Sequence, residues 1–394
     1  MTGKQLNFTV EEYHKRIAGT RAAMLKADLE LLIVCDPANM SWLTGYDGWS
    51  FYVDQCVILA LEGEPLWYGR GIDVSGALRT VFMDPEQVEG YPDHLVHNPP
   101  YHAMTHLAEQ VLPDRGWDGL RTGVEMDNFF YSARAHERLI TGLPKANLVD
   151  ATGLVNWQRA IKSEQEIEYM RIAGKIVEHT HQRIFETIEP GIRKNDLVAE
   201  IYRASIQGAD GHGGEYTSIV PLLPSGADAS ACHLTWDDQP MRAGEGTFFE
   251  IAGCYKRYHC PLSRTIYLGK PTDKFIRVDK AIQEGMLAGL EAAKPGNLCE
   301  DVASAFYTEL KRHGFEKDNR TGYSIGMSYP PDWGERTMSF RVGDKTELQP
   351  GMTFHFMTGL WMDDWGIETT ESILITPEGV ETLSHYPRQL FVKD

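Results

Sequence analysis

The sequence predicts an α+β protein of two domains. The first, residues 1–151, is an α/β domain, and the second, residues 152–394, is built on one curved antiparallel sheet with an internal duplication. At 394 residues the chain is long enough for two separate hydrophobic cores. Helix-start signals alternate with short apolar runs in the first part, and the second part carries an internal repeat. These observations favour an α/β domain followed by a duplicated unit of helices and strands.

The N-terminal domain begins with a helix and a short strand. Thr9 and Glu12 form a capping box that begins a helix extending to about Ala27. An apolar, β-branched run over 29–35 follows and predicts a strand. Further strands are expected at 55–60, 65–69 and 122–125, and further helices at 102–112 and 132–141.

The C-terminal domain begins with a second capping box, Ser163 with Glu166, which predicts a long helix to about Ile188. A shift of 105 residues then aligns several turn and helix residues of the chain with one another. The aligned residues are Pro190-Gly191 with Pro295-Gly296, Asp196 with Asp301, Tyr202 with Tyr307, and Gly246 with Gly351. Each unit reads as two helices followed by strands, so duplication would give one curved sheet covered by helices with a site between the halves.

The amino-acid composition argues against some classes of binding partner. The net charge of −18 argues against nucleic acid and anionic membranes, because both require clustered Lys and Arg. No signal peptide is expected at the N-terminus, and no apolar run reaches membrane-spanning length. The six cysteines are scattered without a C-x-x-C pair, which favours reduced thiols and a cytoplasmic location.

The hairpin-like segment from Phe248 to Thr265 carries the most specific signal. It reads FFEIAGCYKRYHCPLSRT. This frame resembles the first ligand hairpin of the pita-bread enzymes, peptidase family M24, which include methionine aminopeptidase, prolidase and creatinase. The metal-dependent members have two aspartates here, and this chain has Glu250 and Pro261 in their places.

The other three ligand positions of that family are also changed. By the same resemblance, Tyr323 stands at the ligand histidine, Met357 at the first ligand glutamate and Thr370 at the bridging glutamate. Proline and an isolated methionine do not bind hard dications, which require carboxylate oxygen and imidazole. The resemblance therefore implies a pita-bread fold with neither a metal site nor any other cofactor.

Several further segments resemble a metal-free branch of this family that hydrolyses ectoine. They are residues 39–52, 225–238, 321–336 and 354–361. The resemblance implies a cytoplasmic homodimer that opens the cyclic amidine of this small zwitterion to N-acetyl-L-2,4-diaminobutyrate. Asp54 departs from the branch, where a histidine is expected.

Two residues are the expected catalytic pair. Glu250 occupies a former ligand position, and His233 matches the histidine that creatinase-like relatives use to handle the proton. Glu371 adjoins a former ligand position and is expected, with Glu250, beside the substrate cation. Either acid can instead be structural. His259 shares the hairpin with Glu250 but alternates with a strand pattern, so it is a weaker substrate-binding candidate.

The remaining substrate-binding candidates are aromatic or apolar. Tyr323 can donate a hydrogen bond to an oxyanion or a substrate carboxylate, and Met357 occupies a vacated ligand position. Trp42, Trp49 and Tyr52 belong to an aromatic run that can surround a cation, or simply pack in the N-terminal domain. In creatinase-like dimers this domain closes over the site of the partner subunit.

Two other functions remain open from the sequence. A creatinase-type amidinohydrolase acting on a guanidino acid fits the same charges, because creatine is also a cation with a carboxylate. A non-catalytic pita-bread module is the alternative from another class. The presence of both Glu250 and His233 favours an enzyme over that module.

Overall fold

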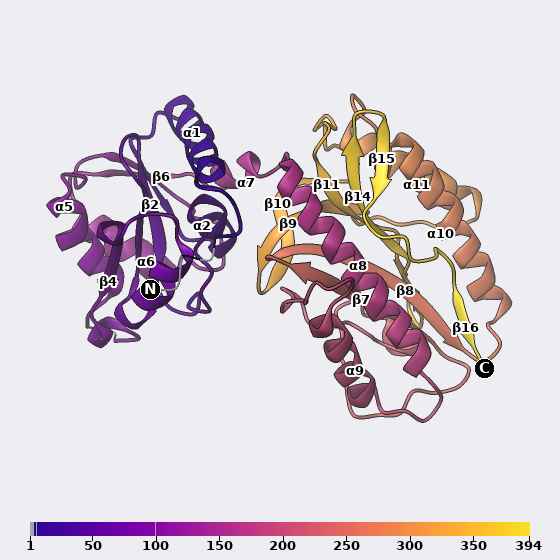
Figure 1. Cartoon of the computed structure of the whole chain (residues 1–394). Coiled ribbons are helices and arrows are strands. Elements are labelled where there is room, and N and C mark those ends of the chain that lie inside the picture. Colours follow the sequence, from indigo (N-terminus) through magenta and orange to yellow (C-terminus); the bar gives the residue numbers. More distant parts are fainter. Residues whose placement is uncertain (1–3, 5, 99) are drawn as a thin grey trace. The chain divides into compact units, whose positions relative to one another are not determined.

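The computed structural model describes residues 4, 6–98 and 100–394 of the chain. It divides into two units, Met1–Gln158 and Arg159–Asp394 (Figure 1). The boundary follows Gln158, later than the 151/152 boundary expected from the sequence. The reason is that helix α7, Leu154–Gln158, belongs to the first unit, where the Asn156 side chain accepts a hydrogen bond from Asn39 at 2.9 Å.

The first unit is an α/β domain with a six-stranded mixed sheet in the order β4-β3-β2-β1-β5-β6. Its strands are β1 Leu31–Val34, β2 Cys56–Ala60, β3 Leu66–Arg70, β4 Val88–Tyr91, β5 Arg121–Val124 and β6 Asn147–Asp150. Besides α7, its helices are α1 Val10–Lys26, α2 Pro37–Thr44, α3 Val74–Thr80, α4 Ala103–His106, α5 Leu112–Asp114 and α6 Ala133–Gly142. A π-helical turn, Leu107–Val111, joins α4 to α5.

Local signals explain the first elements of this unit. The Thr9 hydroxyl accepts the Glu12 backbone N–H at 3.3 Å, which begins α1 where the capping box predicted it. Asp36 caps α2 in the same way, accepting the backbone N–H of Ala38 at 2.8 Å. Gly45, with φ of 87°, ends α2 in the left-handed conformation that favours glycine.

The second unit contains an eight-stranded sheet. Its main path is β15-β14-β11-β9-β8-β16, with β7 paired to β8 and β10 paired to β9. The strands are β7 Gly246–Tyr255, β8 Tyr258–Leu268, β9 Gly322–Tyr329, β10 Asp332–Ser339, β11 Thr353–Met357, β14 Thr370–Thr376, β15 Gly379–Thr382 and β16 Phe391–Lys393. A separate two-stranded ribbon joins β12 Leu360–Trp361 to β13 Gly366–Ile367.

The duplication predicted from the sequence appears as two pairs of long helices, each followed by an antiparallel hairpin (Figure 1). They are α8 Glu164–Thr187 with α9 Lys194–Gln207, and α10 Asp273–Ala292 with α11 Cys299–Arg312. Gly191 and Gly296, with φ of 96° and 88°, form the matching turns between the helices of each pair. The predicted capping box of α8 is also present, with both Ser163–Glu166 bonds formed.

Helix α8 packs closely on strand β7. A Cβ at Gly253 would lie 1.9 Å from the Ala173 carbonyl oxygen of α8, so only glycine fits at this crossing. The core on the side of the second helix pair is formed by α10, α11 and the strands β11 and β14. The sheet that carries the former ligand positions is therefore supported by both helix pairs.

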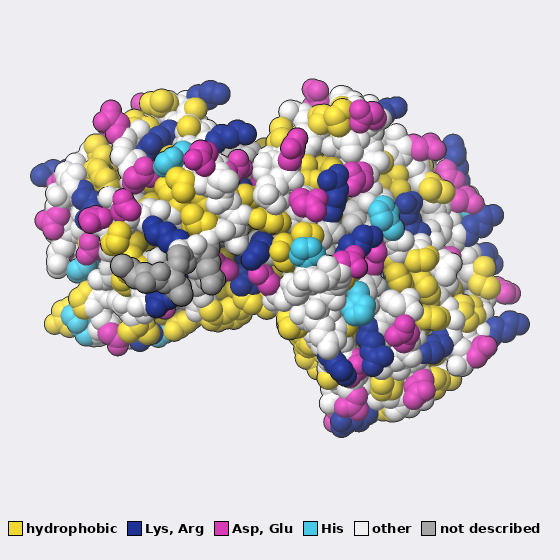
Figure 2. Space-filling model, viewed as in Figure 1, with side chains coloured by type: hydrophobic (Ala, Val, Ile, Leu, Met, Phe, Trp, Pro, Cys, Tyr) yellow, Lys and Arg dark blue, Asp and Glu magenta, His cyan; other side chains and the backbone are white. Residues whose placement is uncertain are grey.

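The surface carries mixed charge. Figure 2 shows Lys and Arg side chains interspersed with Asp and Glu over the visible face of both units. Within the part of the chain that the structure describes, no helix is both long enough and apolar enough to cross a membrane.

Candidate active site

The hairpin β7–β8 fixes the position of Glu250. Glu250 pairs in register with Ser263 on β8, and its backbone also exchanges hydrogen bonds with Leu222 at 3.0 and 3.1 Å. The residue is only 3% exposed, and its carboxylate makes no hydrogen bond to any residue that the structure describes. The closest ionisable partner is His355, whose Nδ1 lies 4.0 Å from Oε1. Backbone pairing thus holds an unpartnered carboxylate in the interior.

Burial changes the acidity of this carboxylate. Desolvation raises the pKa of Glu250 to about 8, and the negative charge of Asp332 adds to the effect. A carboxyl group with this pKa is largely protonated at neutral pH when the site is empty. A bound cation would favour the ionised form, because opposite charge stabilises a carboxylate.

Two former ligand positions are joined through a buried histidine that the sequence reasoning missed. His355 on β11 contacts the Tyr323 hydroxyl through Nδ1 at 3.0 Å and the Thr370 hydroxyl through Nε2 at 2.8 Å. Trp333 donates its indole N–H to the Tyr323 oxygen at 2.8 Å. The backbone N–H of Ser263 donates to Thr370 at 2.7 Å. Strands β8, β9, β10, β11 and β14 therefore meet in one hydrogen-bonded network.

These residues do not fit a dinuclear metal site. Pro261 has no side-chain donor, and the Tyr323 and Thr370 oxygens are already used by His355. Burial lowers the pKa of His355 to about 3, so its ring is neutral and both nitrogens are engaged. In the described part of the chain, the one group with metal-compatible geometry lies elsewhere, at Glu284, Glu309 and His313 of α10 and α11.

Glu371 was expected beside the substrate cation, and the structure places it elsewhere. Its Oε1 accepts from Arg264 at 2.7 Å and lies 3.3 Å from Arg388. Adjacent strand residues face opposite sides of a sheet, so Thr370 faces the His355 network and Glu371 faces away from it. Glu371 therefore forms a buried ion pair with these arginines, and its expected contact with substrate stays a prediction.

His259 is also held by the backbone. Its Nδ1 donates to the Arg257 carbonyl at 2.9 Å, and its Nε2 accepts the Ser218 backbone N–H at 2.9 Å. Burial lowers the pKa of His259 to about 3, so the ring is neutral. With both nitrogens occupied, His259 supports the hairpin and has no free atom for substrate. Its expected contact with substrate stays a prediction, which these two bonds disfavour.

The predicted proton donor lies on a surface loop. His233 is exposed and follows Cys232, whose thiol pKa is raised by burial and by the charges of Glu368 and Glu250. The loop after the 3₁₀ turn Gly226–Ser230 thus borders the buried carboxylates. The structure shows no contact between His233 and Glu250. Met357 is partly buried at the end of β11.

A carboxylate that the sequence analysis did not select lies in the same site. Glu368 is fully buried between β13 and β14, and its pKa is raised well above the usual range by burial and by Glu250. Partial burial lowers the pKa of Lys317 to about 8, and the charge of Glu368 opposes that shift. Arg320 lies over the Tyr323 ring at 4.5 Å. A basic group thus lies near Glu368 and another lies over Tyr323.

The three aromatic residues expected to surround a cation, Trp42, Trp49 and Tyr52, differ in how exposed they are within the first unit. Trp42 is 5% exposed, and the Arg16 guanidinium already lies 4.9 Å from its ring centroid, so it belongs to the core. Trp49 and Tyr52 are 59% and 57% exposed. The Trp49 ring packs against Phe51 in a tilted arrangement, with centroids 4.8 Å apart. Only the latter two of the three candidates remain accessible to a ligand or partner.

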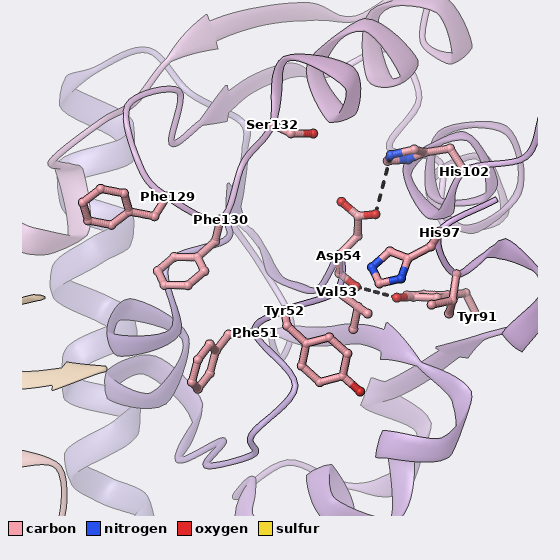
Figure 3. Close-up of a pocket in the computed structure, with 11 residues that line it drawn as sticks. Phe51, Tyr52, Val53, Asp54, Tyr91, His97, His102, Phe129, Phe130 and Ser132 are labelled. Carbon is pink, nitrogen blue, oxygen red and sulfur yellow. Dashed lines mark hydrogen bonds and ion pairs between the residues drawn. The ribbon is translucent and has the colours of Figure 1, made fainter. Parts of the chain in front are cut away.

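Tyr52 and Asp54 line a cavity of about 300 Å³ in this unit (Figure 3). Figure 3 shows the Asp54 carboxylate directed at His102, with 3.6 Å between Oδ2 and Nε2. Tyr91 donates its hydroxyl to the Asp54 carbonyl at 2.9 Å. Asp54, where a histidine was expected from the resemblance, is thus paired with a histidine from another segment.

Comparison with known proteins assigns the family. The description "Metallopeptidase family M24" matches residues 168–377, and "Creatinase/Prolidase N-terminal domain" matches residues 16–161. The ectoine hydrolase of Halomonas elongata is 59% identical over 98% of this chain and 99% of its own. An uncharacterized hydrolase/peptidase of Sinorhizobium fredii is 40% identical over 99% of both chains.

Solved structures agree on the fold. A prolidase from Thermococcus sibiricus has a TM-score of 0.83 at 19% identity, covering 96% of this chain and 99% of its own. The dipeptidase PepE from Mycobacterium ulcerans has a TM-score of 0.80 at 21% identity, covering 98% and 99%. The predicted fold class, a creatinase-like N-terminal domain followed by a pita-bread domain, is confirmed.

The ion pair of Glu371 with Arg264 predicts a stability effect. Glu371→Gln should lose about 3 kcal/mol of unfolding free energy, because it leaves buried Arg264 without its anion. Glu381→Gln is the matched control, since Glu381 pairs with Arg171 at the surface and should cost less than about 1 kcal/mol. Urea unfolding at fixed protein concentration measures both. Equal effects of the two substitutions would contradict the assignment.

Proposed function

Because the chain belongs to the M24 metallopeptidase family and carries its creatinase/prolidase N-terminal domain, we propose that it is a metal-independent hydrolase that opens the ring of ectoine. The observation that carries the proposal is the buried Glu250 carboxylate, which has no cationic partner and stands among residues that do not fit a metal site. The relative named ectoine hydrolase supports the choice of substrate.

The substrate can replace the function of a metal. A metal ion in a hydrolase polarises the bond to be attacked and activates water. The ring amidine of ectoine is protonated at neutral pH, so the carbon to be attacked already carries delocalised positive charge. What the protein supplies is a carboxylate beside that carbon and a group that transfers the proton.

Glu250 is the proposed reactive group. In its ionised form it either attacks the amidinium carbon or removes a proton from the attacking water, and both routes fit its position. Water adds to the amidine carbon overall, and the bond from this carbon to one ring nitrogen breaks. That nitrogen leaves as an amine after receiving a proton, which we assign to His233. The product is an N-acetyl-2,4-diaminobutyrate.

The carboxylate of ectoine requires a cation. Arg320 is suited to this role, because its positive charge acts on both Tyr323 and His355. Tyr323 is the second candidate for contact with substrate, although its hydroxyl already accepts from Trp333. Hydrogen bonding to His355 leaves the phenol fixed in one orientation, which favours positioning of the ligand.

We further propose that the enzyme is a homodimer in the cytoplasm. Trp49, Tyr52 and Phe129 are each more than half exposed on the first unit, and aromatic patches of this kind are typical of interaction sites. A small zwitterion must be shielded from water for charge interactions to be strong. The six cysteines are free thiols, as expected in a reducing compartment.

Turnover without metal is the first test. The purified protein should hydrolyse ectoine at an unchanged rate after dialysis against excess chelator, because the former ligand positions lack suitable donors. Creatine and a proline dipeptide serve as competing substrates in the same assay. Preferential turnover of creatine would favour the amidinohydrolase alternative. Metal near one ion per chain together with loss of activity on its removal would contradict metal independence.

Substitution of the reactive pair is the second test. Glu250→Gln and His233→Ala should each lower kcat by about two orders of magnitude or more. His179→Ala is the control for His233, because His179 is an exposed histidine on α8. In the unsubstituted enzyme kcat/KM should rise with pH up to about 8, where Glu250 ionises. Near-normal turnover in either variant would show that the wrong residue was assigned.

The dimer is tested through its exposed aromatic residues. Trp49→Ala should weaken dimerisation and lower activity in parallel, because the apolar area buried between subunits falls. Leu25→Ala removes a side chain of similar exposure, 65%, from the end of α1 and should change neither. Light scattering gives the oligomeric state at each enzyme concentration assayed. A monomer with full activity would refute the proposal.

A further inference from the structure

The buried glutamates differ in whether their carboxylates have a hydrogen-bond or ion-pair partner. Six glutamates are buried among the described residues, and four of these accept hydrogen bonds or ion pairs. The four are Glu125, Glu166, Glu335 and Glu371. Glu250 and Glu368 have no hydrogen-bond partner among those residues. Burying an unpaired carboxylate is costly, so two such groups in one site require an explanation beyond stability.

Glu368 is the more completely buried of the two. It is 0% exposed, compared with 3% for Glu250, and neither of its carboxylate oxygens has a hydrogen-bond partner in the described structure. Its backbone, in contrast, is held on both sides by one hydroxyl. Thr265 on β8 accepts the Glu368 N–H at 2.9 Å and donates to its carbonyl at 2.9 Å. The main chain is therefore fixed while the side chain is left without a partner.

The neighbouring chain is shaped to accommodate this side chain. A Cβ at Gly359 would lie 2.9 Å from Cγ of Glu368 and 2.7 Å from the Trp361 ring, so glycine is required there. The Gly359 carbonyl accepts from the Lys317 ammonium at 2.6 Å, and that ammonium lies 4.3 Å from the Trp361 ring centroid. Lys317 is thus committed to other groups and does not form an ion pair with Glu368.

Backbone pairing brings Glu368 close to Glu250, because Thr265, which holds the Glu368 backbone, pairs in register with Phe248, two residues before Glu250 on β7. The charge of Glu250 raises the pKa of Glu368, and both carboxylates raise the pKa of the Cys232 thiol. Two like charges in a buried site disfavour each other's ionisation, which a bound cation would reverse. Glu368 therefore belongs to the candidate active site and is not an isolated acid of the core.

We propose that Glu368 is the substrate-binding carboxylate, which accepts an N–H of the amidinium cation and so leaves Glu250 free to react. The proposal rests on the proposed function and adds a specificity-determining residue to it. Hydrogen bonds between two charged groups are the strongest of those available here. Glu371, the acid first expected in this role, is already bound to two arginines.

The test compares Glu368→Gln with Glu378→Gln, an identical change at an exposed acid in the β14–β15 turn. Ectoine binding is measured by calorimetry in the Glu250→Gln background, so that no turnover occurs. Glu368→Gln should weaken ectoine binding at least about tenfold, and with Glu250 intact it should raise KM more than it lowers kcat. Its melting temperature should not fall, because the Glu368 carboxyl has no hydrogen bond that the substitution would break. Glu378→Gln should match the parent protein.

A second probe separates this inference from the choice of substrate. Acetamidinium chloride is a bare amidinium cation, and acetamide is its neutral counterpart. The parent protein should bind the first in preference to the second, and Glu368→Gln should lose that preference. If ectoine is neither bound nor hydrolysed but this preference holds, the proposed substrate is wrong and the role of Glu368 stands.

Three outcomes would overturn the role of Glu368. Unchanged binding of ectoine and acetamidinium in Glu368→Gln would show that another group binds the cation. A lowered melting temperature with unchanged affinity would assign Glu368 to structure alone. A parent protein that binds neither ectoine nor acetamidinium would contradict both this inference and the proposed function.

Discussion

The hydrogen-bond network centred on His355 is the constraint on which the catalytic unit depends. His355 connects Tyr323 on β9 to Thr370 on β14, and Thr370 accepts the Ser263 N–H of β8. In the metal-dependent enzymes that this chain resembles, ligands occupy the positions of Tyr323 and Thr370. Here a neutral ring joins the same strands. Loss of the ring would remove one hydrogen bond from each of two buried hydroxyl groups, leaving Tyr323 only its bond from Trp333 and Thr370 only its bond from Ser263.

That network also determines which charges remain available. Because Tyr323, His355 and Thr370 satisfy one another, none of them neutralises Glu250, whose nearest ionisable neighbour is the uncharged His355 ring. Elsewhere the chain pairs its buried acids, as with Glu335 and Lys162 at 2.5 Å. A bound cation is therefore what would stabilise the ionised form of Glu250. The protein loses stability from this arrangement and gains differential binding of a charged reactant.

Local sequence signals such as capping residues predicted the helices and strands well, whereas the partners of buried side chains could not be predicted. The capping residues Thr9 and Ser163 begin helices where expected, because capping depends on near neighbours in sequence. The roles of Glu371 and Glu368 depend on strand parity and on groups more than a hundred residues away, Arg264 and Thr265. His355 was missed because a histidine two residues before a former ligand position carries no signal of its partners. Only the folded register brings it between Tyr323 and Thr370.

The unpaired carboxylates also explain how such a site discriminates between substrates. A neutral peptide bond would not stabilise the ionised forms of Glu250 and Glu368, so both acids would stay protonated and Glu250 would be unable to react. An amidinium or guanidinium stabilises those ionised forms, so charge selects the class of substrate. It does not distinguish ectoine from an acyclic guanidino acid, because both carry a cation and a carboxylate. That distinction must come from shape, from residues such as Tyr323 whose orientation is fixed by Trp333 and His355. Charge thus selects the class of substrate, and the fixed side chains discriminate between substrates within that class.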